Sequence, residues 1–574
     1  MAKKVPMPWL KFFGDRKKSM KYPNTSMYDE VRRAAEKYPE YVIIDYFGNK
    51  LSYGLFMAEV DRAARGFVSL GAKKGEAISV CAPNTPEALV AIYAINKIGC
   101  VANIFHPLSA PNEIRDYINL AESKLLVAID IAWENVKQIL PETKVGQTII
   151  ISAAGSLPAP MKLGYKLMND LLDIKKLTKN LTQILVKEKG VMNWDTFLGR
   201  GQYVVGDVYE KMKGKDVAVI LYSGGTTGRS KGVALPNLAF NSVAYQAKDF
   251  FPEVLTPGAT MLGIMPIFHG FGLAVGFHIM FCWGANTVMY PKFDATKFDR
   301  ILADAEPTFL VGVPTLYEAM LRNKKIQKMD LSYIKAAVSG GDSLSPKLKS
   351  EIDELLKKGG SDTKLLQGYG LAECLSVVCV NPLDQQRDRS IGIPLADVLM
   401  KVVEPKTYIA KKVGEVGEMV IAGPNLMTGY VNNVKETNET LQTHPDGRVW
   451  LHTGDMGYMD KDGYFYFAQR LKRLIITSGY NVYPNEVEEA IMKVPQVLLA
   501  TVVGVDDKYR GQKVKAFVVL KEDAKPSGEI REAIMKQCQL ELAKYKWPRD
   551  IEFRKTLPKT KIGKVAYTEL MKEG

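Results

Sequence analysis

Cysteine is scarce in this sequence, and the cysteines that occur are not paired. The 574 residues include six cysteines, which are scattered along the chain, and no two of them form a Cys-x-x-Cys pair. This distribution argues against a disulfide scaffold and against a structural zinc site. It is typical of a protein of the reducing cytoplasm, which is where we expect this protein to act.

The sequence pattern predicts neither a signal peptide nor a membrane-spanning segment. The first 18 residues are basic and contain no apolar stretch of signal-peptide length. Residues 268–290 carry no Asp, Glu, Lys or Arg and are long enough to span a bilayer. They also contain two histidines, an asparagine and four glycines, which disfavour insertion. We therefore expect a buried core segment there.

Composition indicates an ordinary globular enzyme of more than one domain. Hydrophobic residues make up 47% of the chain and charged residues 24%, and a chain of 574 residues is too long for one core. The formal net charge is +14. A positive net charge is compatible with binding to nucleotides, to nucleic acid or to an anionic membrane, and it does not distinguish between these partners.

Strand-like and amphipathic segments alternate along most of the chain, which predicts an α/β fold with parallel sheets. AISVCAP, PEALVAIYAINKIG, KLLVAID, AVILYS, FLVGVP and AAVSGG show this rhythm. From about residue 392 short strands and turns predict a β-rich subdomain, and the strands and helices of residues 470–574 predict a small, separate α+β domain. We thus expect a body over 1–469 and a lid over 470–574. The lysine-rich stretch 158–189 is expected to be a solvated helical excursion.

The segment LYSGGTTGRSKG, residues 221–232, combines four glycines, five hydroxyl side chains and a lysine. Free backbone N–H groups, hydroxyl donors and a cation suit a polyanion such as a phosphate. The preceding apolar run reads as a buried strand that holds the loop in place, which disfavours a flexible surface loop. The segment is neither a Walker A sequence nor a Gly-x-Gly-x-x-Gly fingerprint, so it predicts a phosphate loop of another type.

This loop resembles that of the adenylate-forming (AMP-binding) superfamily, which includes acyl-CoA synthetases, firefly-type luciferases and the adenylation domains of peptide synthetases. Further motifs follow in the order known for that superfamily, and together they cover nearly the whole chain. They are PIFHGFG (266–272), SGGDSLS (339–345), QGYGLAE (367–373), GEVGEMVIAGPNLMTGYVNN (414–433), HTGD (452–455), QRLKRLIITSGYNVYPNEVE (469–488) and LPKTKIGK (557–564).

The resemblance implies a two-step reaction with ATP, Mg²⁺ and CoA. A carboxylate first attacks the α-phosphate of ATP, and CoA then displaces AMP to give a thioester. Because carboxylate and triphosphate are both anions, we expect screening and positioning to carry most of the catalysis. The residues that the resemblance assigns to ATP are Ser223, Gly224, Gly225, Thr226, Thr227, Gly228, Gly340, Gly341, Gln367, Gly368, Tyr369, Asp455 and Arg470.

Four residues are expected to take part in catalysis. Lys564 resembles the lysine that reaches the carboxylate and the α-phosphate, where its charge stabilises the transition state more than the ground state. Lys231 resembles the mobile cation of the phosphate loop, and Glu373 the magnesium-binding glutamate, with Thr226 as a further metal ligand. His269 resembles a residue near the acid's carboxylate. Without the resemblance, the two lysines would be ordinary surface residues and the histidine a core residue.

The resemblance also implies a domain rotation between the two steps. Lys472 matches the hinge position, at which a few dihedral angles absorb the change. Gly479 and Tyr480 are expected to line the channel of the pantetheine arm, where a glycine lets that arm pass close to the backbone.

Two positions depart from the superfamily's usual pattern. Ala372 stands where a threonine is usual, which removes a hydroxyl expected near the α-phosphate, so we expect a water or a neighbouring donor to substitute. Ser230 stands where a proline is usual, and we expect this change to be tolerated. Because of Ala372, a scaffold protein that kept the fold but lost most of its catalytic activity is an alternative function. Two further alternatives are an unrelated kinase or ATPase, and a light-emitting oxidative enzyme.

The acid is expected to be a medium to long fatty acid, with aryl acids as the alternative. The uncharged stretch 271–283 mixes bulky and small residues as the wall of an apolar tunnel would, and it holds no carboxylate to pair with an amino acid. The chain ends ten residues after Lys564, so we expect no fused carrier domain, and free CoA is favoured over a separate carrier protein. No nucleic-acid partner is expected. The basic N-terminus and the lysine-rich stretch suggest peripheral membrane contact.

Overall fold

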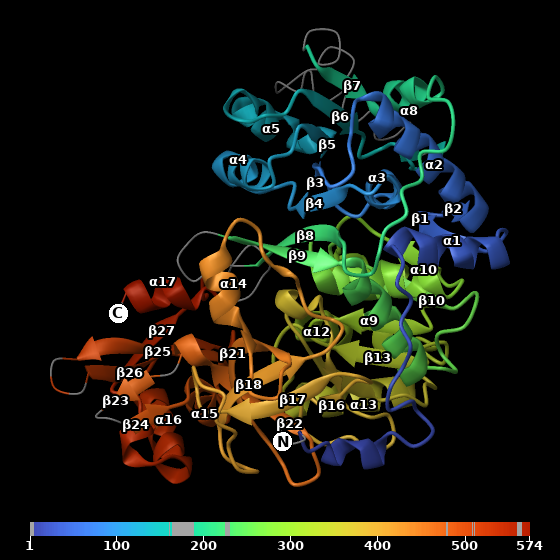
Figure 1. Ribbon diagram of the computed structural model, residues 1–574. Coiled ribbons are helices and arrows are strands. Elements are labelled where there is room, and N and C mark those ends of the chain that lie inside the picture. Colours follow the sequence, from blue (N-terminus) through green and yellow to red (C-terminus); the bar gives the residue numbers. More distant parts are fainter. Residues whose placement is uncertain are drawn as a thin grey trace. The chain divides into compact units, whose positions relative to one another are not determined.

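The computed structural model describes residues 5–159, 161–162, 189–223, 230–473, 475–477, 480–507, 509, 511–558 and 565–573 (Figure 1). Contacts divide the chain into two compact units. The first comprises Met1–Met400 with Ile421–Leu451, and the second comprises Lys401–Val420 with His452–Gly574. The expected domain boundary at residue 470 stays a prediction. Most of the lysine-rich stretch lies outside the described residues.

One sheet of the first unit has eight strands in the order β19-β9-β8-β4-β3-β5-β6-β7. The strands from β8 to β7 run parallel, whereas β9 pairs antiparallel with β8 and β19. Parallel strands are covered on both faces, which explains why these runs are apolar throughout. The strands are β3 (Ala77–Cys81), β4 (Val101–Phe105), β5 (Leu125–Ile129), β6 (Gln147–Ile151), β7 (Val191–Asn193), β8 (Val217–Ser223), β9 (Lys231–Pro236) and β19 (Gly429–Tyr430).

The other sheet of this unit has nine strands in the order β16-β15-β14-β13-β12-β10-β11-β1-β2. The stretch from β14 to β1 is parallel, and antiparallel pairs complete both ends. The predicted parallel α/β class is thus confirmed. The strands are β1 (Val42–Tyr46), β2 (Asn49–Ser52), β10 (Thr260–Gly263), β11 (Asn286–Met289), β12 (Phe309–Gly312), β13 (Ala336–Ser339), β14 (Leu365–Tyr369), β15 (Cys379–Val380) and β16 (Ile393–Pro394).

Helices cover these sheets, and α3 (Pro86–Lys97) is buried along its whole length. Thr85 caps its first turn by accepting a hydrogen bond from the N–H of Ala88, and Pro86 fits the first helical position. Its sequence is apolar on most sides of the helix, which explains why α3 is buried, because only a helix at the surface needs a polar face. The other helices are α1 (Met27–Lys37), α2 (Tyr53–Ser69), α4 (Pro111–Leu120), α5 (Trp133–Ile139), α8 (Trp194–Gly201), α9 (Asn237–Phe250), α11 (Phe298–Ala305), α12 (Pro314–Arg322), α13 (Pro346–Lys358) and α14 (Val434–Thr440).

The uncharged stretch 268–290 is a core segment, as predicted. It forms a π-helix, η4 (Phe271–His278), followed by α10 (Ile279–Cys282) and β11, and its helical part is almost entirely buried. His278 is fully buried, and its Nδ1 and Nε2 lie 3.0 Å from the Tyr93 hydroxyl and 3.2 Å from Asn241 Oδ1. Burial lowers the pKa of His278 to about 3, so the imidazole is neutral. Among the described residues, no helix is both long and apolar enough to cross a membrane.

The second unit contains a small α+β fold, which confirms the predicted C-terminal class. Its sheet has the order β24-β23-β26-β25, and β27 adds parallel to β26. Apolar residues of its strands and of two helices form one core, including Ile491, Val502, Val518 and Ile534. The elements are β23 (Ile475–Thr477), β24 (Tyr480–Val482), β25 (Val497–Asp507), β26 (Gly511–Leu520), β27 (Asp550–Arg554), α15 (Pro484–Met492), α16 (Gly528–Glu541) and α17 (Tyr567–Lys572).

The predicted β-rich region is a sheet in the order β17-β18-β21-β20, with β22 beside β21. The chain passes between the two units within β17 (Leu399–Val403), β18 (Gly417–Ala422) and β21 (Val449–Met459). The remaining strands are β20 (Leu441–Thr443) and β22 (Phe465–Arg470).

A buried polar pair joins β18 to β21 within the second unit. Glu418 is 4% exposed and accepts hydrogen bonds from Nδ1 of His452 at 2.9 Å and from the N–H of Gly454 at 3.0 Å. Burial alone would raise the pKa of Glu418, but these bonds hold it below its ordinary value. The carboxylate therefore fixes the turn that follows His452.

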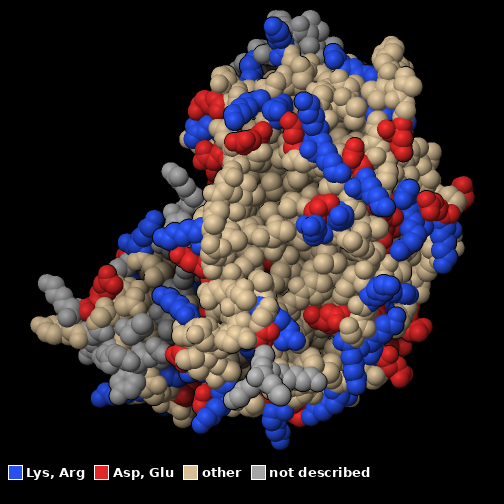
Figure 2. Space-filling model, in the orientation of Figure 1, with Lys and Arg blue, Asp and Glu red and all other residues tan. Residues whose placement is uncertain are grey.

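Charged side chains are mixed on the surface. Figure 2 shows lysine and arginine interspersed with aspartate and glutamate over the visible face, rather than gathered in one basic stripe.

Glu418→Gln is expected to destabilise the second unit at pH 7 by about 1–3 kcal/mol, because a charged hydrogen bond within the sheet is lost. A carboxyl group whose pKa is lower in the folded chain than in the unfolded chain stabilises the fold at pH values above its pKa in the unfolded chain, about 4.3. This stabilisation is lost as the pH falls through the pKa of the group in the folded chain. The difference in thermal midpoint between wild type and variant should shrink as the pH falls below about 4.3. A difference that is independent of pH would contradict an ionised Glu418.

Candidate functional site

The two ends of the phosphate loop are fixed by a strand pair. Ser223 ends β8 and Lys231 begins β9, and the two residues are register partners of the antiparallel pair. Gly224, Gly225, Thr226, Thr227 and Gly228 lie outside the described residues. The hairpin geometry nevertheless places the entry and exit of the loop side by side, at the carboxyl end of β8.

Tyrosines anchor both ends of this loop to helix α4 and strand β4. The Tyr222 hydroxyl donates to Asn103 Oδ1 at 2.8 Å, and the rings of Tyr222 and Tyr117 lie 4.0 Å apart. At the exit, the hydroxyls of Tyr117 and Ser230 are 3.2 Å apart and hydrogen-bonded. A proline at position 230 could not make this contact, so the departure from the usual pattern adds an anchor.

Glu373 lies beside the entry of the loop, in the 3-10 turn Ala372–Cys374. Its Oε1 accepts a hydrogen bond from the Tyr430 hydroxyl at 2.9 Å and another from Ser223 Oγ at 3.3 Å. The backbone is tied as well, because the N–H of Met427 donates to the carbonyl oxygen of Glu373 at 2.8 Å. Two segments distant in sequence, one ending at Ser223 and the other spanning Met427 to Tyr430, therefore position Glu373.

Lys231 is paired with a carboxylate that the motifs do not single out. Its ammonium forms an ion pair with Glu436 on α14 and lies 4.8 Å from the centroid of the Tyr430 ring. The other oxygen of Glu436 accepts a hydrogen bond from the Asn433 amide at 3.0 Å. Burial, and then the charge of Glu373, raise the pKa of Tyr430 well above its ordinary value, so its hydroxyl stays protonated.

Gly270 lets the loops of His269 and Glu373 touch. A Cβ on Gly270 would stand only 1.7 Å from the carbonyl oxygen of Leu375, two residues after Glu373. His269 directly precedes Gly270, so the sequence-predicted residues His269 and Glu373 belong to loops in direct contact. Phe271 extends from the same loop to Gly340, where a Cβ would meet its ring at 3.4 Å.

The expected adenine-binding residues lie at the carboxyl ends of two neighbouring strands. Parallel pairing of Ser339 on β13 with Gln367 on β14 brings Gly340 beside Gly368. Gly341 has a φ of +76°, a left-handed conformation that favours glycine. Tyr369 ends β14 and is half-buried. The structure thus brings together residues 340–341 and 367–369, as the resemblance implies for the base.

The described residues contain no cluster of three or more His, Cys, Asp or Glu side chains that could hold a metal. Glu373 instead offers one carboxylate, with hydroxyl groups beside it. Mg²⁺ commonly binds through one or two carboxylates, waters and substrate phosphates, so this donor set fits a magnesium ion shared with ATP. Thr226, the second expected ligand, lies outside the described residues.

In the second unit, Asp455 and Arg470 are adjacent. They are register partners on β21 and β22, and Nε of Arg470 lies 2.7 Å from Oδ1 of the buried Asp455. Arg473 is held by Glu488 and Asn485, and its guanidinium stacks 3.7 Å from the centroid of Tyr567. Only Leu471 and Lys472 therefore separate the sheet-bound Arg470 from the anchored Arg473.

The remaining predicted residues of this unit are described in part or not at all. Only the backbone is described at Lys472 and Tyr480, whereas Gly479 and Lys564 lie outside the described residues.

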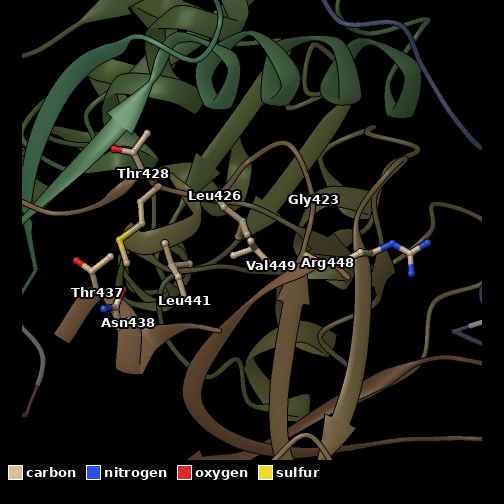
Figure 3. Close-up of a pocket in the computed structure, with 10 residues that line it drawn as sticks. Gly423, Leu426, Thr428, Thr437, Asn438, Leu441, Arg448 and Val449 are labelled. Atoms are coloured by element: carbon tan, nitrogen blue, oxygen red, sulfur yellow. The ribbon is translucent and has the colours of Figure 1, made fainter. Parts of the chain in front are cut away.

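A separate pocket of about 630 Å³ lies next to the segment that holds Glu373 (Figure 3). None of the sequence-predicted site residues lines it. Thr428, Thr437 and Asn438 lie on one side of the view, Leu426, Leu441 and Val449 lie at its centre, and Arg448 points away from them. Arg448 is paired with Asp446 instead.

Sequence reasoning does not find Tyr430, Glu436 or Tyr117. Tyr430 lies within the motif of residues 414–433, Glu436 belongs to the ordinary polar helix α14, and Tyr117 lies on α4, more than 100 residues before the loop. Only the position of Tyr430 within a recognised motif offered a signal.

Comparisons with known proteins show which families and structures the chain is similar to. The family model described as AMP-binding enzyme matches residues 31–431, and the model described as AMP-binding enzyme C-terminal domain matches residues 486–564. A protein named long-chain-fatty-acid–CoA ligase from Bacillus subtilis (strain 168) is 32% identical, over 99% of this chain and 98% of its own. A protein of the same name from Salmonella typhimurium is 30% identical, over 96% and 94%. The crystal structure of the ATP-bound RpMatB-BxBclM chimera B1 matches with a TM-score of 0.82 and 26% identity, over 96% of this chain and 99% of its own.

Gly270→Ala is expected to lower the thermal midpoint strongly, because the new methyl group would meet the backbone oxygen of Leu375, which cannot move without shifting its loop. The cost should reach or exceed the 1–3 kcal/mol that is roughly usual for overpacking. Gly276→Ala is the matched control, since no heavy atom lies within 4 Å of that Cβ position. Equal midpoints for both variants would contradict the contact between the two loops.

Proposed function

The chain belongs to the AMP-binding enzyme family, and we propose that it joins a long-chain fatty acid to CoA. It is an AMP-forming acid–thiol ligase. In the first step, an oxygen of the acid's carboxylate bonds to the α-phosphorus of ATP and pyrophosphate leaves. In the second step, the thiolate of CoA bonds to the carbonyl carbon of the acyl-adenylate and AMP leaves.

One observation carries this proposal most directly. The carboxylate of Glu373 is held by Ser223 and Tyr430 beside the entry of the phosphate loop, while Lys231 stands at its exit. The pair Ser223 and Lys231 flanks the site of the triphosphate, and Glu373 supplies the anionic anchor for Mg²⁺. When bound there, Mg²⁺ would neutralise charge on the phosphate oxygens, and this lowers the barrier between two anions.

The other residues orient the reactants. Tyr369 stacks on adenine, and Gly340 and Gly341 let the base approach the backbone. Asp455 accepts hydrogen bonds from the ribose hydroxyls, and its ion pair with Arg470 holds it in place for this role. His269 lies near the acid's carboxylate. Lys231 exchanges Glu436 for a phosphate oxygen when ATP binds.

Lys564 provides the charge that stabilises the transition state of adenylation. A rotation at Lys472 then withdraws it and brings residues 479–480 to the thiol. The anchors on either side support this hinge, because Arg470 is fixed in a strand pair and Arg473 is fixed among Glu488, Asn485 and Tyr567. The two residues between these anchors are where the change in dihedral angles is most easily absorbed.

The π-helix η4 is the proposed wall of the acyl site. It leads from Phe271, next to Gly340, into an uncharged and buried part of the first unit. Gly276 lies within it and is buried, yet no heavy atom occurs within 4 Å of the place where its Cβ would be. Such a void in an apolar core accommodates a hydrocarbon chain. The names of the two relatives favour a long-chain acid, and an aryl acid is the alternative.

Free CoA is the proposed acceptor, in preference to a separate carrier protein. We also propose peripheral contact with an anionic membrane through the basic N-terminal segment, because each lysine or arginine near such a surface contributes about 1 kcal/mol.

The reaction is tested by measuring AMP, ADP and pyrophosphate over a panel of carboxylic acids, with and without CoA. We expect AMP and pyrophosphate with fatty acids, and an acyl-adenylate that hydroxylamine traps when CoA is left out. Lys564→Ala should slow adenylation by about 10²–10³-fold, because a charge aimed at the transition state is removed. Lys559→Ala, in the same segment, is the matched control and should stay near wild type. ADP as product would indicate a kinase or ATPase, and no product with any acid would indicate a scaffold.

The acyl site is tested by Gly276→Leu, which fills the void beside η4. The variant should keep activity with short acids and lose activity with long ones, so that the preferred chain becomes shorter. Gly199→Leu is the control, because this helical glycine also has no heavy atom within 4 Å of its Cβ position and lies on α8, away from η4. Unchanged chain-length dependence in Gly276→Leu, at wild-type stability, would place the acyl chain elsewhere.

A further inference from the structure

Tyr430 makes two different contacts with two different site residues. Its hydroxyl donates to Oε1 of Glu373 at 2.9 Å, and the face of its ring lies 4.8 Å from the ammonium of Lys231. One side chain therefore touches both the expected cation ligand and the expected phosphate-binding cation. We infer that Tyr430 is a positioning residue that couples cation binding at Glu373 to the placement of Lys231. This inference rests on the proposed function.

The hydroxyl decides which carboxylate oxygen is left for a cation. Oε1 of Glu373 accepts from both Tyr430 and Ser223, and among the described residues no hydrogen bond to Oε2 is found. A carboxylate held at one oxygen presents the other in a fixed direction, and such supporting hydrogen bonds tune the affinity of a metal site. A tyrosine hydroxyl has an ordinary pKa of about 10, so it is a hydrogen-bond donor at neutral pH.

The ring is held as firmly as its hydroxyl. Tyr430 is 8% exposed, pairs with Val233 of β9, and donates its N–H to Thr437 Oγ1 at 2.8 Å. Val233 lies two residues after Lys231 on the same strand, so the strand pair places the ring next to this lysine. The face of a tyrosine ring attracts a cation electrostatically, and this attraction does not require the single fixed direction of a hydrogen bond. The ammonium of Lys231 can thus exchange Glu436 for a phosphate oxygen and keep its contact with the Tyr430 ring.

Two substitutions separate these contacts. Tyr430→Phe removes the hydroxyl and keeps the ring, whereas Tyr430→Leu removes both. The measurement is ATP affinity of the full chain by calorimetry, over a series of Mg²⁺ concentrations and in EDTA, without acid or CoA, so that no turnover contributes. Tyr245→Phe is the matched control, because the Tyr245 hydroxyl donates to the carboxylate of Glu30 at 3.0 Å, elsewhere in the same unit.

Tyr430→Phe should raise the Mg²⁺ concentration for half-maximal ATP binding by about 10-fold, the lower end of what lost supporting bonds cost a metal site. Its ATP affinity in EDTA should match that of the wild type. Tyr430→Leu should show the same Mg²⁺ shift and a weaker ATP affinity in EDTA as well, because Lys231 loses the ring. Tyr245→Phe should change neither quantity.

A second arm keeps the inference testable if Tyr430→Leu folds poorly. In a Glu373→Gln background, Tyr430→Phe should cause no further shift in Mg²⁺ dependence, because residues that act through each other are not additive. A wild-type Mg²⁺ profile for Tyr430→Phe, or additive effects in the double variant, would overturn the inference alone. A wild-type chain that binds no ATP with Mg²⁺ would overturn the proposed function and the inference with it.

Discussion

The geometry of the site depends on how one carboxylate is held next to a loop that receives other anions. Glu373 is fixed at Oε1 by hydroxyls from two strands and at its backbone by Met427, so its charge is directed and cannot retreat into solvent. A carboxylate and a triphosphate repel each other, so their reaction needs a cation between them, and in the proposed function Glu373 is the residue that would hold this cation as Mg²⁺. The remaining elements of the first unit bring other groups to the same place.

Backbone contact, rather than side-chain packing, joins the loops around this carboxylate. Gly270 meets Leu375 so closely that no side chain fits, and Gly340 admits the ring of Phe271. The two parallel sheets supply the frame, since the carboxyl ends of neighbouring strands lie at the same edge and present their loops together. The π-helix then continues from this edge into the core, where Gly276 leaves open space on its Cβ side, which is the proposed place of the hydrocarbon chain.

In the second unit, the proposed hinge lies between two anchored arginines. Arg470 belongs to a strand pair with the buried Asp455, and Arg473 is locked by a carboxylate, an amide and an aromatic ring. Two residues lie between these anchors. A change of backbone dihedrals confined to them leaves both cores intact, which is the physical requirement for a domain that moves as a rigid body.

The sequence alone determined the fold class and the order of its elements, because periodicity and apolar runs report local burial. Strand β3, helix α3 and helix α15 stand where their patterns place them, and motif order was enough to infer the chemistry. Only the tertiary structure decided which side chains complete the site. Nothing in the local sequence predicts the contacts of Tyr430, Glu436 and Tyr117. Their partners lie 57, 205 and 113 positions away in the sequence, so these contacts exist only after the sheets assemble.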